Sequence, residues 1–361
     1  MTFNATETTR RQRGPSNGAL AEALFALAER EPPGERRLAF LKAGYAAFDT
    51  IGRGRPAALE DAPAWLRPVV ETLAACPGEG ALEAAVQRLG GDRAPRRRGT
   101  RDRFLTRAEV AQVLAEAPAD LQPERLRGAF HWHTRSSDGT ATVETMARAC
   151  RARGASWAVV TDHSKGLDVA SGLDPEGVRL QRRAVDRWNA HNGDELRVLH
   201  GLEVEILEDG GVDVPSSERH EVECFVAAVH RRFDPDRDQT ERLLRAVGTP
   251  GVHVLAHPRG RHFQQRPGLR ARWELVFAAC AEASVAVEIN GFPRRQDLDW
   301  ELARLAAASG CEFVLASDAH AVRHLEFDAY ACAIAAKAGV PRQRILNAGQ
   351  AEAFEAWLRD R

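Results

Sequence analysis

Hydrophobic and polar positions along the 361-residue chain follow two different patterns. Between Ala19 and about residue 91, apolar residues recur three and four positions apart, as in ALAEALFALAER, and Pro and Gly separate the segments. This spacing predicts short amphipathic helices. From about residue 126, short apolar runs alternate with helical patterns such as TVETMARACRARG. A small all-helical domain should therefore precede a larger α/β domain.

Seven apolar runs in the second part are predicted strands. Helical patterns separate most of them, although a polar, irregular stretch, EDGGVDVPSSERH, joins the third run to the fourth. Repetition of strand and helix predicts a parallel sheet, and seven units predict a closed or nearly closed barrel. The runs are 127-RGAFHWH, 156-SWAVVTDH, 196-LRVLHGLEVE, 222-VECFVAAVH, 252-VHVLAHP, 285-VAVEING and 312-EFVLASDAH.

The same patterns predict four segments. Residues 1–18 are a polar, disordered tail, residues 19–92 are the helical module, residues 93–125 are a linker with a short helix, and residues 126–361 are the barrel. The linker opens with the Arg-rich run RAPRRRGTRDRFLTR. Such a run is either a solvated connection or an arm that contacts phosphates.

Composition excludes some classes of protein. The formal net charge of −1 provides no global field for nucleic acid or membrane. The sequence has neither a signal-peptide core nor an apolar stretch of about 20 residues, so we expect a cytoplasmic protein that does not span a membrane. The six cysteines form no C-x-x-C pair, which fits free thiols in a reducing compartment.

Histidines and carboxylates gather where the predicted strands end. The C-terminal strand ends of a β/α barrel converge on one face, so these side chains should meet there. His131 and His133 should share one side of an extended strand. Nine side chains exceed the needs of one ion, and imidazole with carboxylate suits Zn, Mn or Fe, so we predict two or three divalent ions. The predicted ligands are His131, His133, Asp138, His163, Glu203, His230, His257, Asp318 and His320.

The motifs H-x-H-T-x-x-S-D-G, T-D-H-S, G-x-E, V-H, A-H-P, E-I-N-G and S-D-A-H, in this order, resemble the PHP (polymerase and histidinol phosphatase) domain. The variant carried at the C-terminus of bacterial family X DNA polymerases is the most similar, and TDHSKGLDVASGLD, QTERLLRAV and ILNAG fit it too. The resemblance covers about residues 126–361. It implies a distorted seven-stranded TIM-like β/α barrel with a trinuclear metal centre and phosphoesterase activity.

The resemblance also implies how the ligands divide and which other residues act. A metal-bridging hydroxide would attack phosphorus, with Glu203, Asp318, His320 and Arg295 as catalytic residues and Arg295, Arg261 and Lys165 as substrate-binding residues. Other family branches often have His at the position of Asp138. The implied groups are His131, His133, Glu203 and Asp318 for one ion, Asp138, His163 and His320 for a second, and His230 and His257, bridged by Glu203, for a third.

The helical module resembles the small helix-hairpin-helix domain that opens family X polymerases. Its hairpin would be 76-CPGEGALEAAVQ-87, with Gly78 and Gly80 presenting backbone N–H groups to a phosphate. Glu79 departs from the usual apolar residue there, so a module that only packs or dimerises is the alternative. The polymerase palm is absent, because the short segment between module and barrel contains no paired catalytic aspartates.

The remaining histidines are predicted to lie outside the ligand set. His200 should be a core residue, and Asp162 should orient the backbone or a ligand. The other histidines, expected at the surface or behind the ligands, are His191, His220, His253, His262 and His324.

Taken together, these patterns predict a metal-dependent phosphoesterase. Its substrate would be nucleic-acid 3′ ends or nucleotide phosphodiesters, as in exonucleases and DNA repair enzymes. A small-molecule phosphomonoesterase of the histidinol-phosphatase type is the alternative within the same class. A non-catalytic DNA-binding or scaffold protein is the alternative of another class. DNA is a possible partner through the helical module and the Arg-rich linker.

Overall fold

The computed structural model describes residues 15, 17–49, 62–77, 79–91, 103–166, 171–215, 221–263 and 265–360. The chain divides into two compact units between Gln112 and Val113. The division falls inside the segment 93–125 that was predicted to link the helical module to the barrel. Most of the predicted tail, 1–18, and most of the Arg-rich run lie outside the described residues.

The first unit is helical, as its apolar periodicity predicts. Helix α1 is buried along nearly its whole length and packs against α2, α3 and α4. Phe25 of α1 meets Tyr45 edge to face with ring centroids 5.1 Å apart. The helices are α1 Asn17–Arg30, α2 Glu35–Asp49, α3 Leu66–Ala74 and α4 Glu79–Gly90. A fifth helix, α5 Arg107–Glu116, spans the division between the units.

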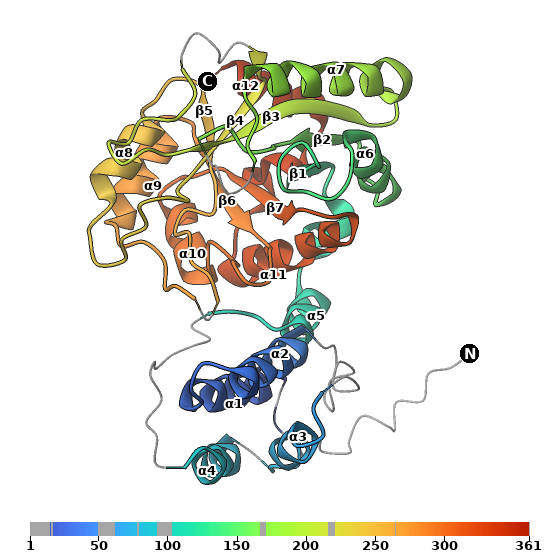
Figure 1. Ribbon diagram of the computed structural model, residues 1–361. Helices are drawn as coiled ribbons and strands as arrows, with labels where there is room; N and C mark the ends of the chain where they lie inside the picture. Colours follow the sequence, from blue (N-terminus) through green and yellow to red (C-terminus); the bar gives the residue numbers. More distant parts are fainter. Residues whose placement is uncertain are drawn as a thin grey trace. The chain divides into compact units, whose positions relative to one another are not determined.

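The second unit is a closed parallel barrel, which confirms the predicted fold class. Each strand pairs with the next, and β1 pairs with β7 to close the ring. Figure 1 shows these strands at the centre, with helices α6 to α11 around them. The strands of the described residues are β1 Gly128–Trp132, β2 Trp157–Val160, β3 Arg197–Glu205, β4 Cys224–Ala228, β5 Val252–Leu255, β6 Ala286–Asn290 and β7 Phe313–Ala319.

Helices connect most of the strands, and several begin at a capping side chain. Asp299 accepts hydrogen bonds from the backbone N–H groups of Glu301 and Leu302, which fixes the start of α10. Asp174 caps α7 in the same way, with Pro175 as its first residue. The helices are α6 Val143–Ala152, α7 Pro175–Asn192, α8 Thr240–Val247, α9 Trp273–Glu282, α10 Trp300–Ala308, α11 Asp328–Ala338 and α12 Ala351–Arg359.

Two apolar layers hold the barrel together. The inner layer combines inward residues of the strands, such as Phe130 and Val226, with Phe354 and Leu358 of α12. The outer layer packs strand residues such as Trp132 against α6 and α7. Burial of these side chains stabilises the barrel by about 25 cal/mol for each Å² of apolar surface removed from water. Among the described helices, none is long and apolar enough to cross a membrane.

Candidate metal centre

The nine predicted ligands all lie at the C-terminal ends of strands or in the segments that follow. Parallel strands of a barrel bring these ends to one face, and that is where the side chains meet. Their positions are His131 in β1, His133 and Asp138 after β1, His163 after β2, Glu203 in β3, His230 after β4, His257 after β5, Asp318 in β7 and His320 after β7.

The carboxylate of Glu203 lies at the centre of the cluster. It is almost fully buried, and histidine rings surround both of its oxygens. Because these rings come from separate strand ends, Glu203 joins segments that are far apart in sequence. The distances from Oε2 are 3.0 Å to His163 Nδ1, 3.3 Å to His131 Nε2 and 3.5 Å to His133 Nε2, and those from Oε1 are 2.8 Å to His257 Nε2 and 3.2 Å to His230 Nε2.

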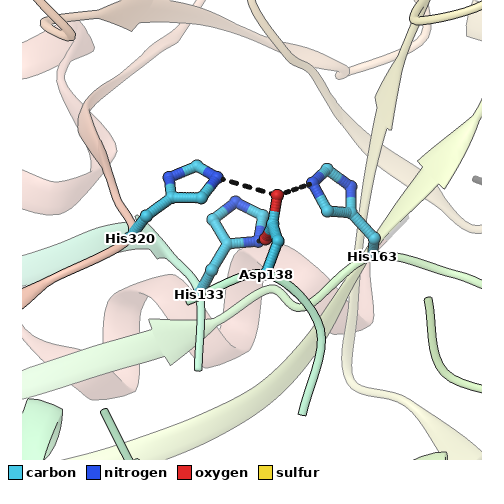
Figure 2. Close-up of side chains that lie close together, drawn as sticks. All are labelled: His133, Asp138, His163 and His320. Carbon is cyan, nitrogen blue, oxygen red and sulfur yellow. Dashed lines mark ion pairs between the residues drawn. The ribbon is translucent and has the colours of Figure 1, made fainter. Parts of the chain in front are cut away.

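Asp138 forms a second centre nearer the mouth of the barrel. Figure 2 shows its carboxylate between the rings of His163 and His320, with His133 beside it. Its Oδ2 lies 3.5 Å from His163 Nε2 and 3.2 Å from His320 Nε2, and its Oδ1 lies 3.6 Å from His133 Nδ1. Since His163 faces Asp138 through one nitrogen and Glu203 through the other, its ring connects the two centres.

Asp318 lies on the other side of His133. Its Oδ1 is 3.4 Å from His133 Nε2, 3.5 Å from His320 Nδ1 and 3.8 Å from His131 Nε2. Its Oδ2 is 3.0 Å from Arg295 Nε. A single carboxylate thus faces the histidine cluster on one side and a guanidinium on the other.

Three groups of these side chains can each place their ligand atoms within 4.8 Å of one another. His133 belongs to two of them and His163 to two, whereas the resemblance assigns each of these rings to one ion. His257 and Asp318 border the groups without belonging to any of them. The groups are His133, Asp138, His163 and His320; His131, His133 and Glu203; and His163, Glu203 and His230.

Several buried atoms of the predicted ligands make no hydrogen bond with the described residues, although charged or ring atoms lie close to them. They include His131 Nε2, His230 Nε2, Glu203 Oε2 and both ring nitrogens of His133. Burying such atoms without a partner is costly, and native proteins rarely do so without a reason. A divalent cation among them would satisfy these atoms together, so the residues fit a metal centre.

The surroundings of the cluster shift the pKa values of its side chains. Burial opposes the charged form of Glu203, but the rings of His163, His131 and His230 outweigh burial and hold the pKa of Glu203 well below its usual range. Burial and the neighbouring His320 and His163 lower the pKa of His133 to about 3. His133 is therefore neutral at physiological pH, which is the form that binds metals.

Two carboxylates that sequence reasoning did not assign hold the ligand rings from behind. Glu288 Oε1 lies 2.7 Å from His131 Nδ1, and Glu205 Oε2 lies 2.9 Å from His230 Nδ1. A carboxylate at Nδ1 fixes the ring orientation and leaves Nε2 free to face a metal. The sequence did indicate that these two carboxylates lie near the cluster. Glu205 follows Glu203 by two residues in the same strand, and Glu288 lies near the end of β6.

Asp162 has a different role from the ligands, in keeping with its prediction. Its carboxylate accepts hydrogen bonds from the backbone N–H of Thr134 at 2.8 Å, from Thr134 Oγ1 at 2.6 Å, and from Ser137 and Gln181. These bonds hold the turn that carries Asp138. Gln181 also pairs with His200 at 3.1 Å, which confirms His200 as a buried residue outside the ligand set.

The backbone is unusual at three ligand positions. His131, His257 and Asp318 have φ values of 57°, 25° and 50°, which non-glycine residues rarely adopt. At His131 the pairing of β1 with both neighbours shifts register. Phe130 consequently points into the barrel and Trp132 outward, although they are two residues apart. Regular alternation along a strand predicted that His131 and His133 share one side. The two rings do lie together, with centroids 5.2 Å apart, although the strand is irregular between Phe130 and Trp132.

The predicted substrate-binding residues differ in exposure. Arg295 is partly exposed beside Asp318, and Lys165 is exposed after β2. Arg261 is buried, and its guanidinium donates to the backbone carbonyls of Arg295 and Gln296. This position favours a role for Arg261 in holding the Arg295 segment over direct contact with substrate.

The other described histidines belong to none of the three groups of candidate ligands. His191 is exposed on α7, and His262 bonds to the carbonyl of Phe263. His253 was expected at the surface or behind the ligands. It is buried and accepts a hydrogen bond from the Phe225 backbone at 3.0 Å. His324 accepts a bond from the backbone N–H of His320 at 3.3 Å, and His220 lies outside the described residues.

Comparisons with known proteins show relatives of two kinds. The chain is 31% identical over 236 residues to the DNA polymerase/3′-5′ exonuclease PolX of Bacillus subtilis, which is 65% of this chain and 41% of that protein. It is 27% identical over 207 residues to a probable phosphatase of Aliivibrio fischeri, covering 54% of this chain and 78% of the relative. No protein-family model matches the chain.

A solved structure also overlaps partly with the chain. It is a histidinol phosphate phosphatase from Lactococcus lactis in complex with zinc, L-histidinol and phosphate. The TM-score is 0.41 at 15% identity, over 62% of this chain and 94% of the other.

Proposed function

On the premise that the barrel is a PHP domain, homologous to the exonuclease-polymerase and to the probable phosphatases, we propose that the chain is a metal-dependent phosphoesterase. The observation that carries the proposal is the buried Glu203 carboxylate, which lies within 3.5 Å of histidine nitrogens from separate strand ends. Bound ions would supply a Lewis acid for phosphoryl oxygens and lower the pKa of water.

Residues of the chain would bind and orient the phosphoester. Arg295 pairs with Asp318 through Nε, while its buried Nη1 has no hydrogen-bond partner among the described residues. A guanidinium N–H in this position can donate to a phosphoryl oxygen and neutralise charge that develops during reaction. The interior of the cluster is buried, and exclusion of bulk water there strengthens these interactions. Its buried side chains are His131, His133, His163, Glu203, His257 and Asp318.

The leaving group would face the mouth of the site. His320 and Asp138 are the most exposed of the nine side chains, at 25% and 33%. Of these two, His320 is the one that can hold a proton for a departing oxygen while the buried side chains stay fixed. Burial opposes the charged form of Asp138, but hydrogen bonds from His163 and His320 outweigh burial and hold the pKa of Asp138 well below its usual range. His131, His133 and Glu203, at 0–1% exposure, would hold the centre in place.

As substrate we propose phosphodiesters at nucleic-acid 3′ ends. The higher identity to the exonuclease-polymerase supports this choice, and so does the Arg-rich run of residues 93–107. A small phosphomonoester is the second candidate. It is favoured by the probable phosphatase, whose match covers 78% of its own length.

The test is elemental analysis of the purified protein, followed by assays with Mn or Zn on a 3′-ended oligonucleotide, a small phosphodiester and a small phosphomonoester. We expect two to three ions per chain and oligonucleotide trimming. The trimming rate at low substrate should fall steeply with salt, because phosphate contacts release counterions. Removal of residues 1–107 should weaken oligonucleotide cleavage about ten-fold, or about 1.4 kcal/mol, and spare the small phosphodiester.

Other outcomes would select another function. Brisk phosphomonoester hydrolysis without oligonucleotide cleavage would favour the small-molecule phosphatase. Oligonucleotide cleavage that is unchanged by the truncation would exclude a role of the helical module in binding nucleic acid. Less than one ion per chain, with none of the three activities, would leave the non-catalytic DNA-binding or scaffold protein.

A further inference from the structure

Arg242 on helix α8 is a charged side chain that the proposed chemistry does not use. It belongs to the QTERLLRAV stretch, and its side chain is only 5% exposed. The neighbouring charged residues Glu241 and Arg245 of the same helix are exposed. A guanidinium is costly to bury unless hydrogen bonds and an opposite charge compensate it. The groups that compensate Arg242 therefore indicate its role.

The guanidinium of Arg242 binds the chain after two different strands. After β3, its Nε donates to the carbonyl of Leu207 at 2.9 Å and its Nη2 donates to the carbonyl of Ile206. After β4, Nη2 also donates to the carbonyl of Arg231 at 3.2 Å, and Nη1 donates to that of Arg232 at 3.3 Å. Arg242 thereby ties together the segments that follow Glu203 and His230.

Glu205 supplies the compensating charge and extends the connection to His230. Its Oε1 lies 3.7 Å from Arg242 Nη2. The same carboxylate accepts the backbone N–H groups of His230 and Arg231 and lies 2.9 Å from His230 Nδ1. A continuous chain of contacts therefore runs from Arg242 through Glu205 to the ring of His230, whose Nε2 ends 3.2 Å from Glu203 Oε1.

We propose that Arg242 is the positioning residue of the His163, Glu203 and His230 group, acting through Glu205 to aim the His230 ring at Glu203. The inference rests on the proposed metal-dependent function, because it gives this group an ion to hold. Arg242 is not one of the candidate ligands, and it would act on that ion only through Glu205 and His230. Its planar, five-donor side chain is the one that can bind the carbonyls of both segments and the carboxylate at once.

The test compares Arg242→Met with Arg245→Met in the full-length protein. Met keeps much of the apolar stem of Arg242 but removes all its donors. Arg245 lies on the same helix, is exposed and donates to the carbonyl of Asp209 at 3.1 Å, so it is the matched control. Zinc content and affinity are measured by equilibrium dialysis and elemental analysis, with circular dichroism to confirm the fold.

We expect Arg242→Met to bind one ion 10- to 100-fold more weakly, because partners of metal ligands tune affinity by about this factor. The remaining ions should bind as in the unaltered protein, and Arg245→Met should bind all of them normally. Selective loss of one ion is a result that a purely stabilising role of Arg242 would not give.

A second pair of variants covers the case in which Arg242→Met does not fold. Arg242→Lys keeps the charge beside Glu205 but offers only three donors, so it should weaken the same ion to a smaller extent. Combined with Glu205→Gln, it should weaken that ion less than the sum of the two single effects, because both act through one chain of contacts.

The outcomes separate this inference from the proposed function. If the unaltered protein binds its ions and either Arg242 variant binds all of them with unchanged affinity, the positioning role is wrong and the phosphoesterase proposal stands. If the unaltered protein binds no transition metal, both fail.

Discussion

Glu288 Oε1 lies 2.7 Å from His131 Nδ1, and its other oxygen accepts the backbone N–H of His257 at 2.6 Å. One buried carboxylate thus fixes two histidines that face Glu203. We expect Glu288→Gln to weaken metal binding 10- to 100-fold, because the amide cannot hold the His131 ring in the same way. Competition with a chromogenic chelator measures this. Glu282→Gln, at the exposed last residue of α9, should bind metal normally. Equal affinity in both variants would refute the role of Glu288.

Glu203→Gln should lose metal and most activity, since it removes the negative charge at the centre of the cluster. The apolar layers of the barrel remain, so the fold should survive. Elemental analysis and the assay of a small phosphodiester measure the two effects. His200→Ala is the control for a buried side chain nearby: it should lower the melting temperature and leave the metal content unchanged. Full activity of Glu203→Gln would show that the centre lies elsewhere.

Asp162→Asn should loosen the turn that carries Asp138. Thr134, Ser137 and Gln181 all donate hydrogen bonds to the Asp162 carboxylate. The NH2 group of asparagine is itself a donor, so it cannot accept from them. We expect the free energy of unfolding to fall by about 2 kcal/mol, as for the loss of a hydrogen bond to a charged group. Denaturant titration measures this loss. The exposed Asp194→Asn should change it by less than about 0.5 kcal/mol, and the same small change in Asp162→Asn would contradict the prediction.

Removing the metal should make stability depend on pH. Burial disfavours the charged form of His230 and His320, but nearby carboxylates raise the pKa of each to about 9. Since both pKa values exceed the unfolded value of about 6.5, the stabilisation is fully present below pH 6.5 and is lost as pH rises through 9. Denaturant titrations with chelator at pH 7 and pH 9.5 should show this fall.

The metal-loaded protein is the comparison for that experiment. Ions bind neutral imidazole, so loading should remove most of the loss between pH 7 and pH 9.5. His133 and His257, whose burial lowers their pKa to about 3, stay neutral over this range and contribute nothing to it. A metal-free protein with equal stability at both pH values would argue against charged rings at positions 230 and 320.

The barrel and the meeting of the strand ends could be predicted from the sequence, because both follow from local patterns. Short apolar runs between helical segments define the strands. Parallel pairing in a barrel brings the C-terminal ends of the strands to one face, whatever the exact register of the pairs. That His131, Glu203 and Asp318 come together could therefore be predicted from their place at the ends of separate runs. The helix-hairpin-helix likeness of the first unit stays a prediction, since Gly78 lies outside the described residues.

The parts that escaped prediction depend on contacts between distant segments. The left-handed backbone at His131 arises where β1 fits against both neighbours, and neither alternation nor propensity encodes it. Arg242 lies in a helix whose other charged residues face solvent, so only the folded chain distinguishes it from Arg245. Glu205 and Glu288 were visible as strand-end carboxylates, but which ring each one supports is a property of the three-dimensional packing.

Closure of the ring by β1 and β7 has a consequence for how the protein is made. The segments that bring Thr140 beside His320 are 180 residues apart, and Phe354 and Leu358 of α12 join the inner apolar layer from a position still later in the chain. Contacts this remote form late in folding, and the ribosome must release most of the chain before they can form at all. Nascent chains therefore carry open strand edges until the last strand of the ring has been made, and these edges can pair with other chains in the meantime.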